Sequence, residues 1–311
     1  MSLLSPCWDV LGIGCTAVDD LLYVEAYPAP DTKVRLRRRE RQGGGLTATA
    51  LVAASRLGAR CAFAGVLGDD EDSRFVIDTL SHEGIDVGPL VRRPSARPIH
   101  STIIVDETHH TRTILYDLAG TVGADIEAPP ADVIRSARVL LIDHYGVEGM
   151  TRASRIAREA GVAVVADFER QDWPGFAGLL ALVDHLIVAR SFAERLTGAG
   201  TPEEAIERLW GSGRQLVAVT YGADGCWYRD ASSPGGLIHQ SAFVVPVRDT
   251  TGCGDVFHGA YASALARGMG ADERIRFASA AAALKATRGG GQWGIPTREE
   301  TERLLTKDSV S

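Results

Sequence analysis

Short apolar segments alternate with longer alanine-rich segments along most of this chain, and this alternation limits the possible folds more than any other feature. Apolar runs rich in β-branched residues predict buried strands, and amphipathic alanine-rich runs predict helices. Strands are expected at 10–13, 61–66, 139–142, 162–166, 185–188, 216–220 and 243–247, and helices near 47–57, 72–83, 149–160, 191–197, 202–211, 255–267 and 272–286. The pattern predicts an α/β fold in which helices cover both faces of a mainly parallel central sheet.

Two segments depart from the alternation, at about 20–42 and 99–118. Both show strand-like spacing of apolar residues around a turn, with His109-His110 at the turn of the second, and neither contains a helical stretch. We expect two antiparallel hairpins that form a small β lid over the strand ends, where α/β folds bind their ligands. Because no linker or repeat interrupts the chain, residues 1–311 are expected to form one domain that includes both lid segments.

Composition and charge narrow the class of protein further. With 311 residues, of which 45% are hydrophobic, the chain is long enough to bury a large core. A formal net charge of -7 argues against general binding of nucleic acid or of an anionic membrane surface. The five cysteines are odd in number and form no CxxC pair, so neither a disulfide framework nor a zinc site is expected. We therefore expect a soluble cytoplasmic enzyme that neither spans a membrane nor binds nucleic acid.

The most informative stretch is Asp249–Ala260, which reads DTTGCGDVFHGA and opens one of the predicted helices. Backbone N–H groups at a helix start have no intrahelical partner and carry the positive end of the helix dipole, so they can bind an anion. Gly252 and Gly254 would let this backbone approach a phosphate closely. Asp255, in the first helical turn, could accept a proton from an alcohol that attacks the phosphate, or it could simply cap the helix.

A second glycine pattern, Gly12-x-Gly14-x-x-Ala17, follows the first predicted strand and matches the spacing of a dinucleotide-binding turn. Such a turn needs a helix directly after it and an acidic residue about 20 positions on, at the end of a second strand. Here Asp19-Asp20 and a proline-containing stretch leave no room for that helix, so a nicotinamide cofactor is not expected.

Asp249–Ala260 resembles the C-terminal signature of the PfkB family of sugar kinases, D-T-x-G-A-G-D-x-F, and departs from it only in Cys253, which replaces an alanine. The resemblance implies a three-layer αβα ribokinase-like fold and transfer of the γ-phosphate of ATP, with Mg2+, to a sugar hydroxyl. It also implies catalytic roles for Gly252, Cys253 and Gly254 as the anion hole and for Asp255 as the base. The position of Cys253 at a helix N-terminus predicts a lowered thiol pKa.

The likeness extends over nearly the whole chain. Gly43–Gly45 with Thr49 is similar to the family's N-terminal signature, and Thr220-x-Gly222-x-x-Gly225 resembles its nucleotide-binding turn. The substrate-binding residues that the resemblance implies are Asp19, Lys33, Gly44, Gly45, Thr49, Tyr116 and Asp143. The ATP-binding residues that it implies are Arg190, Thr220, Gly222, Gly225, Gly252 and Gly254. Asp249 and the backbone of 289–291 resemble a monovalent-cation loop, so activation by K+ is a further expectation.

Two departures from the family pattern bear on activity. Thr49 stands where the family has asparagine, so a hydrogen bond to a sugar hydroxyl could be shortened or lost. The N-x-x-E motif that helps to order Mg2+ would fall on 189–192, where it is absent, and Mg2+ could then be held mainly by nucleotide phosphates and water. Arg190 either contacts phosphate or is a solvent-exposed arginine at a helix start. A non-catalytic relative that binds a metabolite is the alternative to an active kinase.

The nature of the substrate depends on a finer resemblance. The run 256–260 is similar to that of sulfofructose kinases, and ketohexokinases are a looser likeness. Of the lysine, asparagine and arginine that bind the sulfonate there, the lysine survives as Lys33, whereas the other two positions hold Tyr116 and Tyr145. Aromatic area in place of charge predicts a neutral ketose or related furanose, phosphorylated on a primary hydroxyl. The alternative is an anionic sugar that binds the arginines of 35–41, and a homodimer through the lid is the expected assembly.

Overall fold

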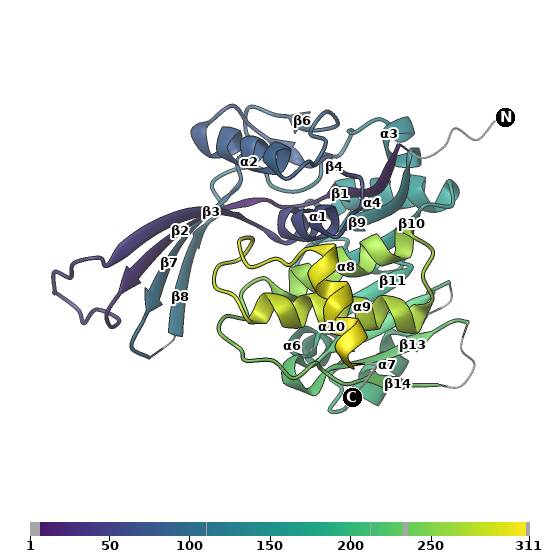
Figure 1. Ribbon diagram of the computed structural model, residues 1–311. Helices are drawn as coiled ribbons and strands as arrows, with labels where there is room; N and C mark the ends of the chain where they lie inside the picture. Colours follow the sequence, from purple (N-terminus) through teal and green to yellow (C-terminus); the bar gives the residue numbers. More distant parts are fainter. Residues whose placement is uncertain (1–6, 110, 212, 233–235, 309–311) are drawn as a thin grey trace.

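The central sheet of the computed structural model has the strand order β14-β13-β12-β11-β10-β9-β1-β4 (Figure 1). The structure describes residues 7–109, 111–211, 213–232 and 236–308. Neighbouring strands are parallel from β4 to β12, and β13 and β14 complete the sheet in antiparallel pairing, so the prediction of a mainly parallel sheet is confirmed. The strands are β1 (Trp8–Ile13), β4 (Cys61–Phe63), β9 (Ala137–Ile142), β10 (Ala163–Asp167), β11 (His185–Ala189), β12 (Leu216–Thr220), β13 (Cys226–Asp230) and β14 (Ile238–Gln240).

Helices cover both faces of this sheet because its central strands have apolar side chains on both sides. Along β9, Val139 and Leu141 pack into one helical layer, and Leu140 and Ile142 pack into the other. These side chains are all buried, as expected for a parallel sheet covered on both faces. One layer contains α1 (Leu46–Arg56), α2 (Glu71–His82), α8 (Cys253–Ala266), α9 (Ala271–Ala286) and α10 (Arg298–Asp308). The other contains α3 (Ala131–Arg135), α4 (Val147–Glu159), α5 (Phe176–Leu180), α6 (Arg190–Thr197) and α7 (Pro202–Leu209).

The lid is a second sheet with the order β3-β2-β7-β8, and it projects from one side of the layered body (Figure 1). Its strands are β2 (Ala17–Val24), β3 (Arg38–Gly44), β7 (Ile99–Asp106) and β8 (Thr111–Asp117). β2 with β3 and β7 with β8 form the predicted antiparallel hairpins, and parallel pairing of β2 with β7 joins them into one sheet. His109 lies in the turn of the second hairpin, and His110 lies outside the described residues.

Two predicted strands differ in the structure. The segment 61–66 is divided between β4 and β5, and β5 leaves the central sheet to pair with β6. The prediction of a strand at 243–247 is wrong, because this segment is irregular and Val244 and Val247 are exposed. Pro246 has no backbone N–H, so at this position the segment cannot donate the hydrogen bond that pairing with a neighbouring strand requires. The short strands are β5 (Val66–Leu67) and β6 (Val91–Arg92).

A charged network connects the base of the lid to α2. The two ring nitrogens of His100, on β7, lie 2.8 Å from Asp72 Oδ2 and 3.1 Å from Asp20 Oδ2. Arg41, on β3, lies within ion-pair distance of both carboxylates. The pKa of His100 is raised, chiefly by its hydrogen bond to Asp72, because the carboxylates favour the charged imidazolium. This charge therefore stabilises the joint between the lid and the body.

We predict that the stability contributed by His100 depends on pH. Because its pKa is raised in the folded state, the contribution is complete below the unfolded value of about 6.5 and is lost as pH rises through the folded value. In urea denaturation, the free energy of unfolding of His100→Gln should therefore fall furthest below that of the native sequence near about pH 6, and the deficit should shrink by about pH 9. His82→Gln, at an exposed position of α2, is the control. A deficit that grows with pH would contradict the assigned charge.

Candidate active site

The predicted anion hole lies at the N-terminus of α8. Gly252 precedes the helix in the left-handed conformation (φ 76°), which glycine adopts without strain. The amide of Cys253 donates to the Thr250 carbonyl, and the amide of Val256 donates back to Gly252. Apart from its chain neighbours and the helix's own backbone, no described atom lies within 4 Å of the place that a side-chain carbon on Gly254 would take. The space beside Gly254 is thus open, and this leaves room for an anion at the helix start.

Segments that are far apart in the sequence converge beside this turn. A side-chain carbon on Gly252 would lie 3.7 Å from the Asp255 carboxylate, 3.6 Å from Thr49 on α1 and 3.7 Å from Gly291. The structure therefore brings Asp255 and Thr49, two of the predicted site residues, to the anion hole. Gly291 belongs to the loop after α9, which the sequence associates with a cation rather than with the reaction.

Asp255 belongs to a group of carboxylates that influence one another. Burial raises the pKa of Asp255, and the negative charges of Asp167, Glu169, Asp19 and Asp143 raise it further. Asp167 ends β10 and Glu169 follows it, and burial raises the pKa values of both. A carboxylate with a raised pKa is a stronger proton acceptor, so this environment suits a general base.

The glycines of the N-terminal motif lie where the lid strand β3 meets α1, next to the Asp19 carboxylate. A side-chain carbon on Gly44 would lie 2.3 Å from Asp19 Oδ2, so a larger residue here would displace the Asp19 carboxylate. Gly45 precedes α1 with a φ of 92°, a conformation that favours glycine. Burial raises the pKa of the Asp19 carboxyl, and a hydrogen bond with Ser101 of β7 opposes that shift. The lid thus supplies a carboxylate close enough to Asp255 to affect its pKa.

Gln292 joins the site although no sequence pattern singles it out. Its Nε2 donates to the hydroxyl of Thr49 at 3.3 Å, and both side chains are buried. A side-chain carbon on Gly43 would lie 2.6 Å from Gln292 Oε1, so this glycine makes room for the glutamine. Thr49, which stands where the family has asparagine, is therefore held by a hydrogen bond from the loop after α9. A lone glutamine in a glycine-rich loop has no periodicity by which the sequence could identify it.

Asp143 has a structural role in the site, and its contact with substrate stays a prediction. Its side chain is fully buried, and its carboxylate accepts hydrogen bonds from the Cys15 amide at 2.6 Å, the Thr47 hydroxyl at 2.8 Å and the Tyr145 amide at 2.8 Å. These bonds tie the loop after β1 and the start of α1 to the end of β9. Asp143 thus holds the walls of the site in place.

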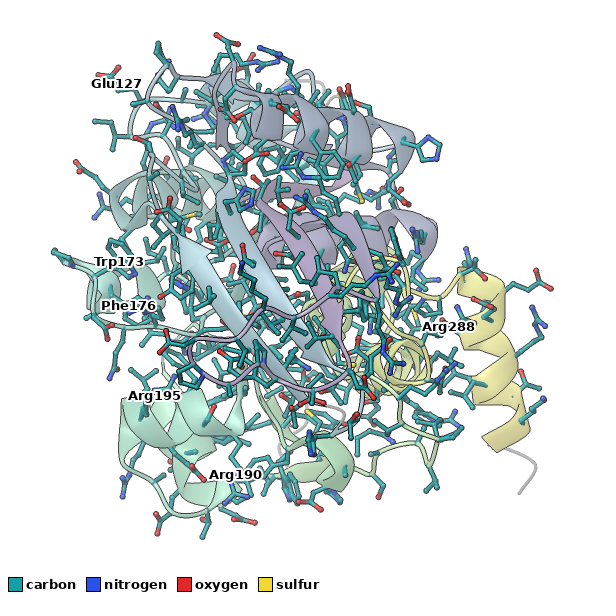
Figure 2. All side chains as sticks on the ribbon, turned by 90° about the vertical axis from the view of Figure 1, so that its left-hand side faces the viewer. Glu127, Trp173, Phe176, Arg190, Arg195 and Arg288 are labelled. Atoms are coloured by element: carbon teal, nitrogen blue, oxygen red, sulfur yellow. The ribbon has the colours of Figure 1, made fainter. Side chains whose placement is uncertain are left out.

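Tyr116 and Tyr145 are accompanied by a basic residue that the sequence pattern did not single out. Arg170, in the loop after β10, donates to the Tyr116 hydroxyl at 3.3 Å. The ring of Tyr145 lies 6.2 Å from that of Trp173, and in Figure 2 Trp173 lies to one side of the lid strands. The available signal for Arg170 was its place directly after a buried parallel strand, where α/β folds hold functional residues.

Lys33 and the arginines of 35–41 are the predicted partners of an anionic substrate, and their surroundings do not favour this role. Lys33 lies in the exposed connection between β2 and β3, and it forms no hydrogen bond or ion pair with the part of the site that the structure describes. Arg39 pairs with Asp20, and Arg41 pairs with both Asp20 and Asp72. The charge of these arginines is therefore offset by carboxylates at the base of the lid.

The predicted nucleotide turn follows Thr220, the last residue of β12, and contains the short 3-10 helix η1 (Gly222–Asp224). Gly222 has a φ of 58°, and the space beside it is open. Gly225 has a φ of 92°, and a side-chain carbon there would lie 2.1 Å from the Gln240 carbonyl. Glycine is thus required at both positions, and at Gly222 it leaves the backbone accessible to a ligand.

Arg190 flanks this turn at the start of α6, in the lower part of Figure 2. Its guanidinium lies 5.3 Å from the centre of the Tyr221 ring and forms an ion pair with Glu194 at 2.7 Å. Its side chain is 58% exposed, and contact with a phosphate stays a prediction.

Phe192 occupies the position of the missing motif glutamate. It is buried in the core, with its ring 6.3 Å from that of Phe176. Within residues 7–308, leaving out 110, 212 and 233–235, no group of three or more His, Cys, Asp and Glu side chains could hold a metal ion.

The predicted lowering of the Cys253 thiol pKa is wrong. Burial raises the pKa of this thiol to about 11, although the positive charge of Lys285 opposes the shift. Desolvation outweighs the helix dipole at this position, so the side chain is a neutral thiol at physiological pH.

Comparison with known proteins agrees with this geometry. Residues 9–298 match the pattern of the pfkB family carbohydrate kinases, and the chain therefore belongs to this family. Ribokinase of Haemophilus influenzae is 29% identical over 305 residues, which cover 94% of this chain and 97% of the relative. Fructokinase-1 of Zea mays is 28% identical, with 85% of this chain and 88% of the relative covered. The protein is accordingly a carbohydrate kinase, a phosphotransferase with an alcohol group as acceptor.

Solved structures support the fold. A protein of Agrobacterium tumefaciens, described provisionally as a ribokinase, has a TM-score of 0.90 and 31% identity over 98% of this chain and 99% of its own. Ribokinase of Thermotoga maritima has a TM-score of 0.82 and 25% identity, with 96% of this chain and 99% of its own covered. The predicted ribokinase-like fold is therefore confirmed. Among the described helices, none combines the length and apolar character needed to cross a membrane.

Proposed function

We propose that the protein transfers the γ-phosphate of ATP to a primary hydroxyl of a ketose or related furanose. The observation that carries this proposal is the open N-terminus of α8 beside Asp255, a carboxylate of raised pKa. Support for ATP comes from a relative with the same fold: the solved Arabidopsis thaliana ribokinase contains ribose and ATP. The open helix start and the adjacent carboxylate both support an active kinase over the alternative, a non-catalytic protein that binds a metabolite.

In the proposed reaction, the sugar hydroxyl gives its proton to Asp255 while its oxygen bonds to the γ-phosphorus. The bond from that phosphorus to the bridging oxygen breaks, and ADP leaves. The backbone at 252–254 would stabilise the negative charge on the transferred group, and this turn is already formed before the substrate binds. Burial, together with the charges of Asp167 and Glu169, keeps the pKa of Asp255 raised, so the carboxylate is a better acceptor for the proton.

Mg2+, bound together with the nucleotide, would neutralise part of the phosphate charge. A protein of Escherichia coli with the same fold was solved with ATP and Mg2+. Because the carboxylate of the N-x-x-E motif is missing, we propose that nucleotide phosphates and water would supply most of the ligands and that the protein would contact the ion only indirectly. Mg2+ loses its water reluctantly, so such indirect contact suits it.

Replacing Asp255 with Asn should lower kcat by about 10²-fold or more, because it removes the general base and keeps the size of the side chain. ATP affinity, measured by calorimetry, should change by less than about 3-fold, because the anion hole is made of backbone. ADP release with a panel of ketoses and pentoses measures kcat. Asp78→Asn, at an exposed position of α2, is the control. Near-native turnover in the Asp255 variant would rule out the assigned base.

The proposal of a neutral sugar depends on the aromatic residues around the site. Tyr116 and Tyr145, with Trp173 beside Tyr145, offer apolar ring faces together with hydroxyl groups, a combination that suits an uncharged sugar. Fructokinases of Zea mays and of rice are among the similar proteins, which supports a ketose. The exposed position of Lys33 provides little for an anionic group, because an exposed ammonium is strongly hydrated.

Arg170 favours a second candidate, a sugar that carries a sulfonate or phosphate group. A planar guanidinium can bind a tetrahedral oxyanion through two N–H groups, and this guanidinium lies beside Tyr116. Asp172 lies 3.5 Å from it and offsets part of its charge, so we keep the neutral sugar as the first candidate.

A kinetic comparison separates the two candidates. For the neutral sugar, kcat/KM should exceed that for its 6-phosphorylated or 6-sulfonated counterpart, and Arg170→Gln should change it by less than about 3-fold. If the substrate is anionic, kcat/KM should be higher for the charged sugars, and Arg170→Gln should lower it by about 10-fold or more, roughly 1.4 kcal/mol of transition-state binding. The second result would overturn the neutral-sugar proposal.

We also propose that two copies associate through the lid. Ile114, Leu115 and Tyr116 of β8 have exposed fractions of 48%, 55% and 55%, and clustered exposed apolar residues mark interaction surfaces. Sedimentation equilibrium should show a dimer that Ile114→Lys weakens, whereas Val244→Lys, at an exposed position outside the lid, should leave it intact. A native protein that stays monomeric at micromolar concentration would contradict the proposal.

A further inference from the structure

Lys285, in the last turn of α9, has a fully buried side chain. Lysine is almost never buried in this way unless its charge has partners. Its ammonium donates to the backbone carbonyls of Asp249 and Arg288, both at 3.3 Å. Burial lowers the pKa of Lys285, and the nearby Cys253 and Asp249 oppose that shift. Only three of the 33 basic residues in the sequence are lysines, so a compact ammonium in this position is unusual for the chain.

The carbonyls that accept from Lys285 belong to the two loops beside the anion hole. Asp249 lies three residues before Gly252, and Arg288 lies in the loop after α9. The Asp249 carboxylate joins the same loops, because it accepts from the Thr251 amide and the Gly290 amide, both at 2.9 Å. In Figure 2, Arg288 lies beside the yellow α10, on the opposite side of the lid strands from Trp173. The positive Lys285 ammonium and the negative Asp249 carboxylate therefore both join the loop before α8 to the loop after α9.

The loop after α9 is shaped around the lysine. A side-chain carbon on Gly294 would lie 2.9 Å from Lys285 Cδ and 3.0 Å from Lys285 Cε, so the stem fills the space that a larger residue would occupy. The Arg288 Cβ would lie 3.1 Å from the same point, so it also limits the space at Gly294. The lysine is thus a packed component of the junction.

The monovalent-cation site predicted at Asp249 and 289–291 does not fit these residues. Protein carbonyl oxygens bind K+ by replacing its hydration shell. Here the carbonyls of Asp249 and Arg288 bind the ammonium of Lys285 instead. The guanidinium of Arg112, on β8, lies 3.7 Å from Asp249 Oδ1 and adds a second positive charge. A further cation would be repelled by both groups.

We propose that the ammonium of Lys285 takes the place of the monovalent cation, so that phosphoryl transfer needs no K+. The inference rests on the proposed function of the 252–254 backbone as the anion hole. An ammonium group has the charge of K+ and donates to the same kind of oxygen, but it is covalently held and cannot be lost to solvent. Lys285 is therefore a positioning residue: it contacts the loops that carry the anion hole and acts through them.

The test compares native protein with Lys285→Ala, Lys285→Met and Lys307→Met, in buffer free of alkali ions and then with KCl or tetramethylammonium chloride at equal ionic strength. The native protein and Lys307→Met, the control at an exposed position of α10, should change in rate by less than about 2-fold. Lys285→Ala removes the charge and leaves space, so its rate should fall by about 10²-fold and recover by about 10-fold or more with K+. Lys285→Met fills the space, so K+ should not restore it.

A second measurement does not depend on turnover. Thermal unfolding of Lys285→Ala should shift upward with KCl and not with tetramethylammonium chloride, whereas that of the native protein should not respond to KCl specifically. Native protein that K+ activates by about 5-fold or more, or whose unfolding temperature K+ raises specifically, would overturn the inference even if the alanine variant does not fold. Absence of phosphoryl transfer in every native sample would instead refute the proposed function, and the unfolding data would then decide the cation question alone.

Discussion

The hydrogen bonds of the Asp249 carboxylate are the interaction on which the active site most depends. Through them the loop before α8 is joined to the loop after α9, although 41 positions separate Asp249 from Gly290. The same carboxylate accepts from the amide and hydroxyl of Thr251 and so shapes the turn that leads to Gly252. These bonds lower the pKa of Asp249 against the effect of burial, so the group stays charged. With Lys285 on the other side, the loop before α8 and the loop after α9 are joined by several hydrogen bonds, so in the proposed reaction the turn is already formed when a phosphoryl group arrives.

Opposing electrostatic effects meet at this helix start. The backbone amides of α8 attract negative charge, whereas Asp255, Asp167 and Glu169 repel it. His258, one turn along α8, lies 2.8 Å from the Gly254 carbonyl and 3.1 Å from Asp167, and so links the helix to the end of β10. The site can therefore bind an anion at the amides and keep a proton acceptor of raised pKa beside it. A kinase needs this combination, because an alcohol must lose a proton while a phosphate is held.

Much of the fold could be predicted because its signals are local. A strand buried on both faces requires apolar residues at successive positions, and a covering helix requires an amphipathic repeat. The run 243–247 shows the limit of this reasoning, since apolar residues with a proline among them can equally lie in an exposed loop. The split of 61–66 between two sheets could not be predicted, because pairing depends on which distant segment lies alongside.

For the site, the sequence by itself determined the chemistry of α8: contiguous residues specify a glycine turn, an open helix start and an acidic group in the first turn. Only the tertiary structure decided what surrounds them. The hydrogen bonds of Asp143 come from separate segments, and the hydrogen bond from Arg170 to Tyr116 joins the loop after β10 to β8 of the lid. The Cys253 thiol is neutral because desolvation there outweighs the helix dipole. The pKa of a side chain and the fit of a cation site both depend on neighbours that come from many segments of the chain. The sequence does not contain the distances to these neighbours.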